Sequence, residues 1–319
     1  MVQIFLIGLG AGIAAAFLFA SIASGALMSL VLFYLAPLPI LIAALGWSHW
    51  AGLIAALVAS AGIAASFSGY LFLAFLLGVG LPAWWLGYLA LLARPVATAA
   101  GIKLEWYPIG RLVVWTAIVS ACVIVAVLLS IGTTEDSLRG ALHRGFELLL
   151  RPQGDMPELP DLPQVSSRID TLVIVAPPAA AVSTTLVNLI SLWLAGRIVN
   201  VSGRLRRPWP ELSAMAFPAL TSTILAAASA GLLLAGLTGI VSSVFAASLA
   251  TAYAVLGFAV LHAITRGMNI RILALACIYV LVVFLPLALV IIALLGLADS
   301  AFDFRGRIAG TRGPPTLRT

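Results

Sequence analysis

Polar side chains that could bind a solute are scarce in the long apolar stretches of this sequence, but one stretch holds several. Asn188 stands in the string STTLVNLIS with Thr184 one helical turn before it, and both follow the pair Pro177–Pro178. A proline inside a helix leaves a backbone carbonyl of the preceding turn without its usual donor. An asparagine amide beside freed carbonyls predicts a solute-binding site made of Asn188, Thr184, Pro177 and Pro178. The alternative is that Asn188 bonds a neighbouring helix, an interaction worth about 0.6–2 kcal/mol.

Sequence motifs for catalysis or nucleotide hydrolysis are missing. The chain has no Gly-x-x-x-x-Gly-Lys-Ser/Thr phosphate loop and no His-Glu-x-x-His zinc motif. No Asp or Glu lies deep in an apolar stretch, whereas ion-coupled transporters usually hold a carboxylate near the middle of the membrane. We therefore expect a protein that is not an enzyme, with no catalytic residue, no metal site and no cofactor.

Small residues recur at every fourth position of the first apolar stretch. They are Gly8, Gly12, Ala16, Ala20 and Ser24. Such spacing places them along one face of a helix, where small side chains let two helix backbones approach closely. This face either packs against another helix of the same chain or docks a separate membrane subunit.

The composition of the chain predicts the kind of structural element that carries these residues. Of 319 residues, 63% are hydrophobic and 9% charged, and the mean hydropathy is +1.17. A soluble domain carries about a quarter charged residues, and a helix needs about 20 apolar residues to cross a bilayer. The sequence therefore predicts an all-α transmembrane helix bundle of eight or nine spans. The apolar segments are 3–23, 25–46, 49–68, 70–93, 109–132, 170–196, 214–239, 242–264 and 271–298.

One long polar stretch, 133–169, separates the fifth and sixth segments. Leu138, Leu142 and Leu149 repeat at helical spacing in its first half, and a threonine at 133 or 134 could cap that helix. This pattern predicts an amphipathic helix at the membrane surface. The second half, QGDMPELPDLPQ, is acidic and rich in proline, which predicts a loop.

Cations in the connecting loops predict the orientation of the chain. Nine Lys and Arg residues fall after the fourth, sixth and eighth segments, against four in 133–169. Positive loops face the cytoplasm, so we expect a cytoplasmic N-terminus. Cations dispersed in this way do not form a nucleic-acid face. Nine spans would export the basic tail, 299–319, so a helix–break–helix hairpin at Pro286 is the alternative that returns it to the cytoplasm.

Three strings, in order along the chain, resemble the YybS-like family of uncharacterised bacterial membrane proteins. They are LAPLPI at 35–40 with Pro37 and Pro39, RLRRPWPELSAMAFP at 204–218 with Trp209 and Pro210, and LGLADSAFDFRGR at 295–307 with Asp299, Phe302, Asp303 and Arg305. The resemblance implies the cytoplasmic (inner) membrane of a bacterium. It also divides the bundle 1–298 into a six-span part, 1–197, and additional spans, 214–298.

The six-span part is similar to the S components of energy-coupling-factor transporters. Those proteins lack an ATPase of their own and dock on a partner subunit through small residues of the first helix. The resemblance therefore implies a subunit that binds or transports a small solute, captured near the 133–169 loop. The alternative function is a structural or assembly scaffold that contacts lipid and protein partners and transports nothing.

Overall fold

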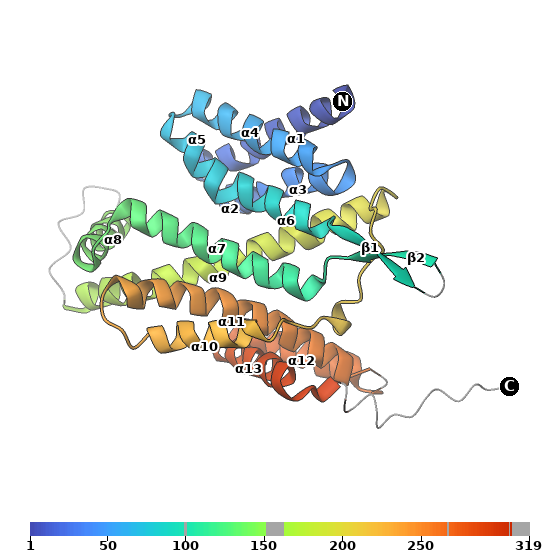
Figure 1. The fold of residues 1–319 in the computed structure, drawn as a ribbon. Coiled ribbons are helices and arrows are strands. Elements are labelled where there is room, and N and C mark those ends of the chain that lie inside the picture. The colour runs from blue at the N-terminus through green and yellow to red at the C-terminus, as the bar shows by residue number, and fades with distance from the viewer. Residues whose placement is uncertain (99–100, 151–162, 267, 306, 308–319) are drawn as a thin grey trace.

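The structure, a computed structural model, describes residues 1–98, 101–150, 163–266, 268–305 and 307, and is built almost entirely of helices (Figure 1). This confirms the predicted all-α polytopic bundle. Within the described residues, seven helical stretches are long and apolar enough to cross a membrane: Val2–Ser24, Leu27–Gly46, His49–Ser66, Tyr70–Ala90, Ile109–Ile131, Ser167–Val201 and Leu237–Ile264.

Among the first four stretches, the third is a single helix and each of the others consists of two or more helical segments. They comprise α1 (Val2–Ala20) with a 3-10 turn (Ser21–Ser24), α2 (Leu27–Tyr34) with α3 (Pro37–Gly46), α4 (His49–Ser66), and α5 (Tyr70–Phe75) with a π-helical turn (Leu76–Gly80) and α6 (Leu81–Ala90). The break between α2 and α3 falls immediately before Pro37, because a proline is best placed in the first turn of a helix.

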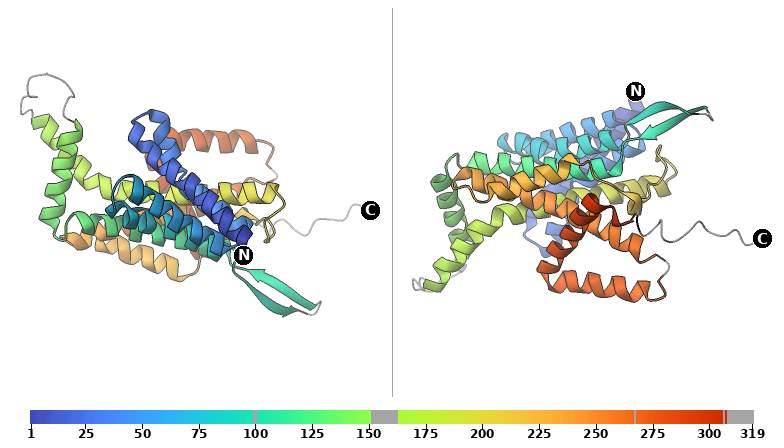
Figure 2. Two further views of the ribbon diagram at one scale, coloured as in Figure 1. Left: turned by 90° about the horizontal axis from the view of Figure 1, so that it is seen from above. Right: turned by 60° about the horizontal axis from the view of Figure 1, so that its bottom comes forward.

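A two-stranded hairpin follows α6, which the sequence analysis treated as a loop. β1 (Ala93–Thr98) pairs antiparallel with β2 (Gly101–Trp106), and Ala93 lies opposite Trp106. The hairpin projects from the bundle (Figure 2). Its sequence alternates Ile102 and Leu104 with charged neighbours, the period-two pattern of a strand. A count of apolar segments does not detect that pattern.

After the hairpin, the described residues form seven further α-helices and a short 3-10 helix at Leu212–Ala214. The α-helices are α7 (Ile109–Ile131), α8 (Glu135–Leu150), α9 (Pro163–Val201), α10 (Leu220–Gly231), α11 (Leu237–Ile264), α12 (Arg271–Phe284) and α13 (Pro286–Phe302). α9 is continuous through Pro177 and Pro178, so the two prolines do not interrupt the sixth span. It begins at Pro163, so the last two residues of the expected loop, 153–164, are helical. The rest of that expected loop lies outside the described residues.

Two of the nine expected spans have no counterpart among the seven long apolar stretches of the described residues. In place of 214–239 the structure has α10, whose 12 residues reach about 18 Å at 1.5 Å each, short of the roughly 30 Å of a hydrocarbon core. Residues 215–219 before it are mostly extended, and 232–236 after it form a turn. In place of 271–298 the chain breaks at Leu285 into α12 and α13. α13 packs on α11, and α12 lies at the edge of the bundle (Figure 2).

Buried side chains form three clusters. The first joins α1 to α6 with one face of α9, the second joins α7, α10, α11 and α13, and the third joins α7, α8, α9 and α11. α9 therefore lies between α3 and α11. It packs against both halves of the bundle, the first made of α1 to α6 and the second of α7, α8 and α10 to α13. The expected division at residue 197 falls at the end of this shared helix.

The connecting loops gather at two ends of the bundle (Figure 1). α8 lies across one end, and its first turn is capped as expected: the Ser137 N–H donates to Thr134 Oγ1 at 3.3 Å and the Thr134 N–H donates to Ser137 Oγ at 3.2 Å. The other end holds the N-terminus, the hairpin and the loop 202–219. Arg305 reaches this loop and donates to the Ser213 carbonyl. The described start of the tail thus lies at the N-terminal end, as the hairpin at Pro286 requires.

Candidate functional site

The polar residues predicted to bind a solute hold helices together instead. Asn188 is 3% exposed and its Nδ2 donates to Ser120 Oγ of α7 at 3.0 Å. One turn earlier, Thr185 Oγ1 lies 3.2 Å from Ser248 Oγ of α11. Asn188 and Thr185 therefore join α9 to both neighbours. Thr184 is half-buried beside them, and Pro177 and Pro178 lie inside the unbroken helix. The carbonyls that these prolines leave without a donor belong to Val173 and Ile174, about four helical turns before Asn188.

The small residues of α1 face α4 of the same chain. A Cβ added to Gly8 would lie 2.7 Å from Ile54 Cγ2, and one added to Gly12 would lie 2.7 Å from the Ala55 carbonyl oxygen. Further along, Ala16 contacts Gly62, Ala20 is half-buried and Ser24 is exposed. The face that carries Gly8 and Gly12 thus packs against α4, which is the first of the two alternatives that the spacing left open.

A cavity of about 310 Å³ opens at the seam between the two halves of the bundle. Leu45 of α3 and Ala90 of α6 line one wall, and Leu112 of α7 and Val255 of α11 contribute from the other half. α9 supplies the longest run of the wall, and the 202–219 loop closes the end. Ligand sites are typically apolar clefts of about 300–1,000 Å³ with a few placed polar groups, so this cavity has the size and character of a small-molecule site.

Arg207 is the one ionisable residue in the wall of this cavity. Its Nη1 donates to the Ala90 carbonyl at 3.0 Å and its Nη2 to the Tyr107 carbonyl at 3.4 Å, while its buried Nε has no partner. Burial lowers the pKa of the guanidinium from its ordinary value. A buried N–H without an acceptor is costly. The end of the cavity therefore holds a positive charge, carried by a guanidinium whose two terminal nitrogens already donate to backbone carbonyls.

Aromatic and basic residues surround the same end. Trp209 lines the cavity beside Gly196, whose added Cβ would lie 3.6 Å from the indole ring. The guanidinium carbon of Arg197 lies 5.2 Å from the centre of the Trp209 ring, within the range of a cation–π contact. Pro210 follows in the wall. Two residues of the central string used for the family resemblance, Trp209 and Pro210, thus belong to the cavity.

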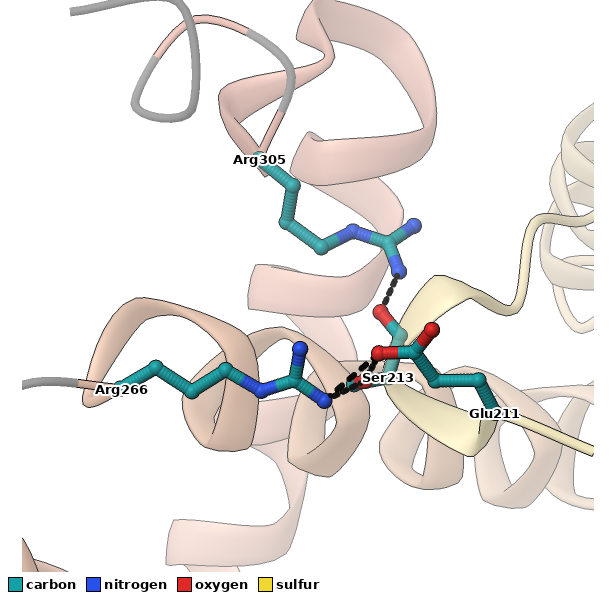
Figure 3. A network of polar contacts seen from close by, with 4 residues as sticks. All are labelled: Glu211, Ser213, Arg266 and Arg305. Atoms are coloured by element: carbon teal, nitrogen blue, oxygen red, sulfur yellow. Dashed lines mark hydrogen bonds and ion pairs between the residues drawn. The ribbon is translucent and has the colours of Figure 1, made fainter. Parts of the chain in front are cut away.

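The loop is tied to the second half of the bundle by a polar network (Figure 3). Arg266 at the end of α11 lies 2.8 Å from Glu211 Oε1 and also donates to Ser213 Oγ. These hydrogen bonds hold the pKa of the Glu211 carboxyl below its ordinary value. Arg305 Nη1 donates to the Ser213 carbonyl at 2.8 Å. The loop therefore contacts α6 through Arg207 and the ends of α11 and α13 through this network.

The third string of the resemblance forms a cap after α13. Asp299 is 3% exposed; its Oδ1 accepts the Arg305 backbone N–H at 3.1 Å and its Oδ2 accepts Arg305 Nε at 2.8 Å. Asp303 adopts the left-handed conformation, with φ of 47°, and ends the helix beside the exposed Phe302. Asp299 therefore fixes the turn that directs Arg305 toward the loop.

Among the described residues, no group of three or more His, Cys, Asp or Glu side chains is placed to hold a metal ion. The sequence analysis missed the cavity because its walls come from segments far apart in the chain. One signal was present: Arg207 lies between Arg206 and Pro208 in a string singled out for its basic and proline residues.

Long apolar helices, buried polar side chains that bond between helices and cations gathered at one end define a polytopic α-helical membrane protein. The family model described as predicted membrane protein (DUF2232) matches residues 12–300, and the chain belongs to that family. Searches of curated proteins and of solved structures give no match.

Proposed function

We propose that this protein is a membrane subunit that binds a small apolar or amphiphilic molecule, in the manner of an S component without its own ATPase. The observation that carries the proposal is the cavity at the seam of the bundle. It is walled by apolar side chains from both halves and has one buried guanidinium at its end. This arrangement combines hydrophobic burial with one group that orients a ligand.

The position of the cavity predicts a different place for ligand binding from the one that the family resemblance implies. The resemblance placed capture near 133–169, whereas the cavity lies by the 202–219 loop at the opposite end of the bundle (Figure 1). The cations of this end support its placement at the cytoplasmic face of the inner membrane, with the N-terminus on the same side. Ligand binding therefore takes place near that face.

Binding is tested by isolating the protein in a mild neutral detergent and identifying bound small molecules by mass spectrometry. The informative variant is Gly196→Leu, because a Cβ there fits beside Trp209 while the rest of the leucine must enter the cavity. The matched control is Gly10→Leu, since Gly10 is exposed on α1 with nothing within 4 Å of an added Cβ. We expect a small molecule in the wild type and the control but not in Gly196→Leu.

Two results would overturn the proposal. One is a folded wild-type protein that carries no small molecule. The other is a molecule retained equally by Gly196→Leu, which would bind elsewhere. Protein partners recovered without a small molecule, and unaffected by Gly196→Leu, would favour the scaffold function instead.

A further inference from the structure

The mouth of the cavity faces the side of the bundle. Leu186, Ile190 and Trp193 follow one another at helical spacing on one face of α9 and line the cavity. They are 38%, 55% and 50% exposed, and they belong to a stretch long and apolar enough to span a membrane. An exposed apolar face on a spanning helix contacts lipid. A ligand therefore reaches the cavity sideways, from the hydrocarbon region of the bilayer.

The wall of the cavity offers few hydrogen bonds to a water-soluble ligand. Within the cavity, the wall other than Arg207 consists of apolar side chains and one glycine. A polar molecule would lose its hydration there without gaining hydrogen bonds. A hydrocarbon chain has no hydration to lose, because it moves from one apolar environment to another.

The end of the cavity has the opposite character. Arg207 presents a positive charge and an Nε–H without an acceptor, and Arg197 lies beside the same indole ring of Trp209. Tryptophan and arginine are typical of the level of the lipid headgroups. A guanidinium is well suited to bind a phosphate. The site thus has an apolar part at the depth of the acyl chains and a cationic part at the depth of the headgroups.

We propose that the ligand of this cavity is an anionic phospholipid. One acyl chain enters past Ile190 and fills the cavity, and the anionic headgroup lies against the positive guanidinium of Arg207 at its end. This inference rests on the proposed function and names the chemical class of its ligand. This binding differs from nonspecific lipid contact because the lipid occupies one site, lies beside one charged side chain and takes one orientation.

The test compares two lipids with identical dioleoyl chains, phosphatidylglycerol and phosphatidylcholine, titrated into delipidated full-length protein in neutral detergent. Native mass spectrometry counts the bound lipids. We expect one phosphatidylglycerol bound at least about tenfold more tightly than phosphatidylcholine, the equivalent of one charge-assisted hydrogen bond. Gly196→Leu is expected to abolish this site for both lipids.

Arginine variants separate this site from general attraction to basic loops. Arg207→Gln is expected to remove the preference for phosphatidylglycerol, whose headgroup carries a net negative charge. It should weaken binding of phosphatidylcholine less, because choline offsets the charge of that lipid's phosphate. Arg206→Gln is the matched control, because Arg206 also donates to a backbone carbonyl, that of Trp47, but does not line the cavity. It should keep the full preference. Arg207→Lys, which retains the charge, should keep most of it if the glutamine variant proves unstable.

The outcomes distinguish the ligand class from the function. Equal affinity of the wild type for both lipids, or an equal loss in Arg206→Gln and Arg207→Gln, overturns the anionic lipid. If another small molecule is then still lost from Gly196→Leu, the proposed function stands. Binding of oleate without binding of phosphatidylglycerol also overturns the phospholipid and assigns the site to fatty acids. If no molecule depends on Gly196, both the ligand and the function fail.

Discussion

The contact between α1 and α4 gives a prediction whose size follows from the structure. In Gly12→Ala, the new methyl carbon would lie 2.7 Å from the Ala55 carbonyl oxygen and 2.7 Å from Val58 Cβ. Carbon contacts are ordinarily about 3.5–4.0 Å, so the helices would have to separate by roughly 0.8 Å or more. Overpacking of this kind costs about 1–3 kcal/mol. Gly10→Ala is the control, because nothing lies within 4 Å of its added Cβ.

The pair of variants isolates the packing energy. Both replace glycine by alanine within α1, so the gain in helix propensity, about 0.5–1 kcal/mol, cancels in the difference between them. The free energy of unfolding should therefore be lower in Gly12→Ala than in Gly10→Ala by about 1–3 kcal/mol. It can be measured by titrating SDS into detergent-solubilised protein and following the fluorescence of Trp47 and Trp50, which flank the start of α4.

Equal stability of the two variants would contradict the contact between α1 and α4. If Gly12→Ala were as stable as Gly10→Ala but lost a co-purifying membrane subunit, the small residues would form a docking face after all. A drop in stability without loss of a partner supports packing within the chain.

Three further perturbations test other parts of the structure. Gly296→Ala places a methyl group against the Tyr253 carbonyl where α13 crosses α11, and should lower the SDS midpoint more than Gly12→Ala because the methyl group would approach that carbonyl more closely and would also meet the Gly257 backbone. Asp299→Asn leaves Arg305 without its charged partner; breaking a buried pair costs about 3–5 kcal/mol, which the same titration measures. Thr134→Ala removes the cap of α8 at about 0.5–2 kcal/mol and should speed amide hydrogen exchange in its first turn.

For each of these three variants, one result would contradict the contact that it tests. A fully stable Gly296→Ala would mean that α13 does not cross α11 closely. For the ion pair, Glu105→Gln is the control, since its exposed pair with Arg94 is worth at most about 1 kcal/mol. An equal loss in both variants would contradict the burial of Asp299. Unchanged exchange in Thr134→Ala would show that Thr134 does not cap α8.

Local features of this fold could be predicted from the sequence because their causes are local. The membrane class follows from apolar length, and the breaks before Pro37 and at Leu285 follow from proline. The cap at Thr134 follows from a threonine three residues before Ser137. These features need no knowledge of which helix lies beside which.

Features that depend on neighbours could not be predicted. The small residues of α1 are compatible with any close helix, and only the fold shows that α4 fills this role. Pro177 and Pro178 lie inside a continuous helix, and that helix packs against α3 and α11. The polar partners of Asn188 and Thr185 lie 68 and 63 residues away in sequence, beyond any local pattern.

The cavity depends on the placement of the two halves relative to each other. Arg207 bonds the carbonyl groups at the end of α6 and before α7, while Ser213 of the same loop accepts hydrogen bonds from Arg266 and Arg305. One short loop thus closes the cavity and contacts both halves. A ligand that fills the cavity and binds Arg207 would add contacts across the seam, and so would stabilise this placement by as much as its affinity allows. Ligand binding and the relative position of the halves are therefore linked through the 202–219 loop.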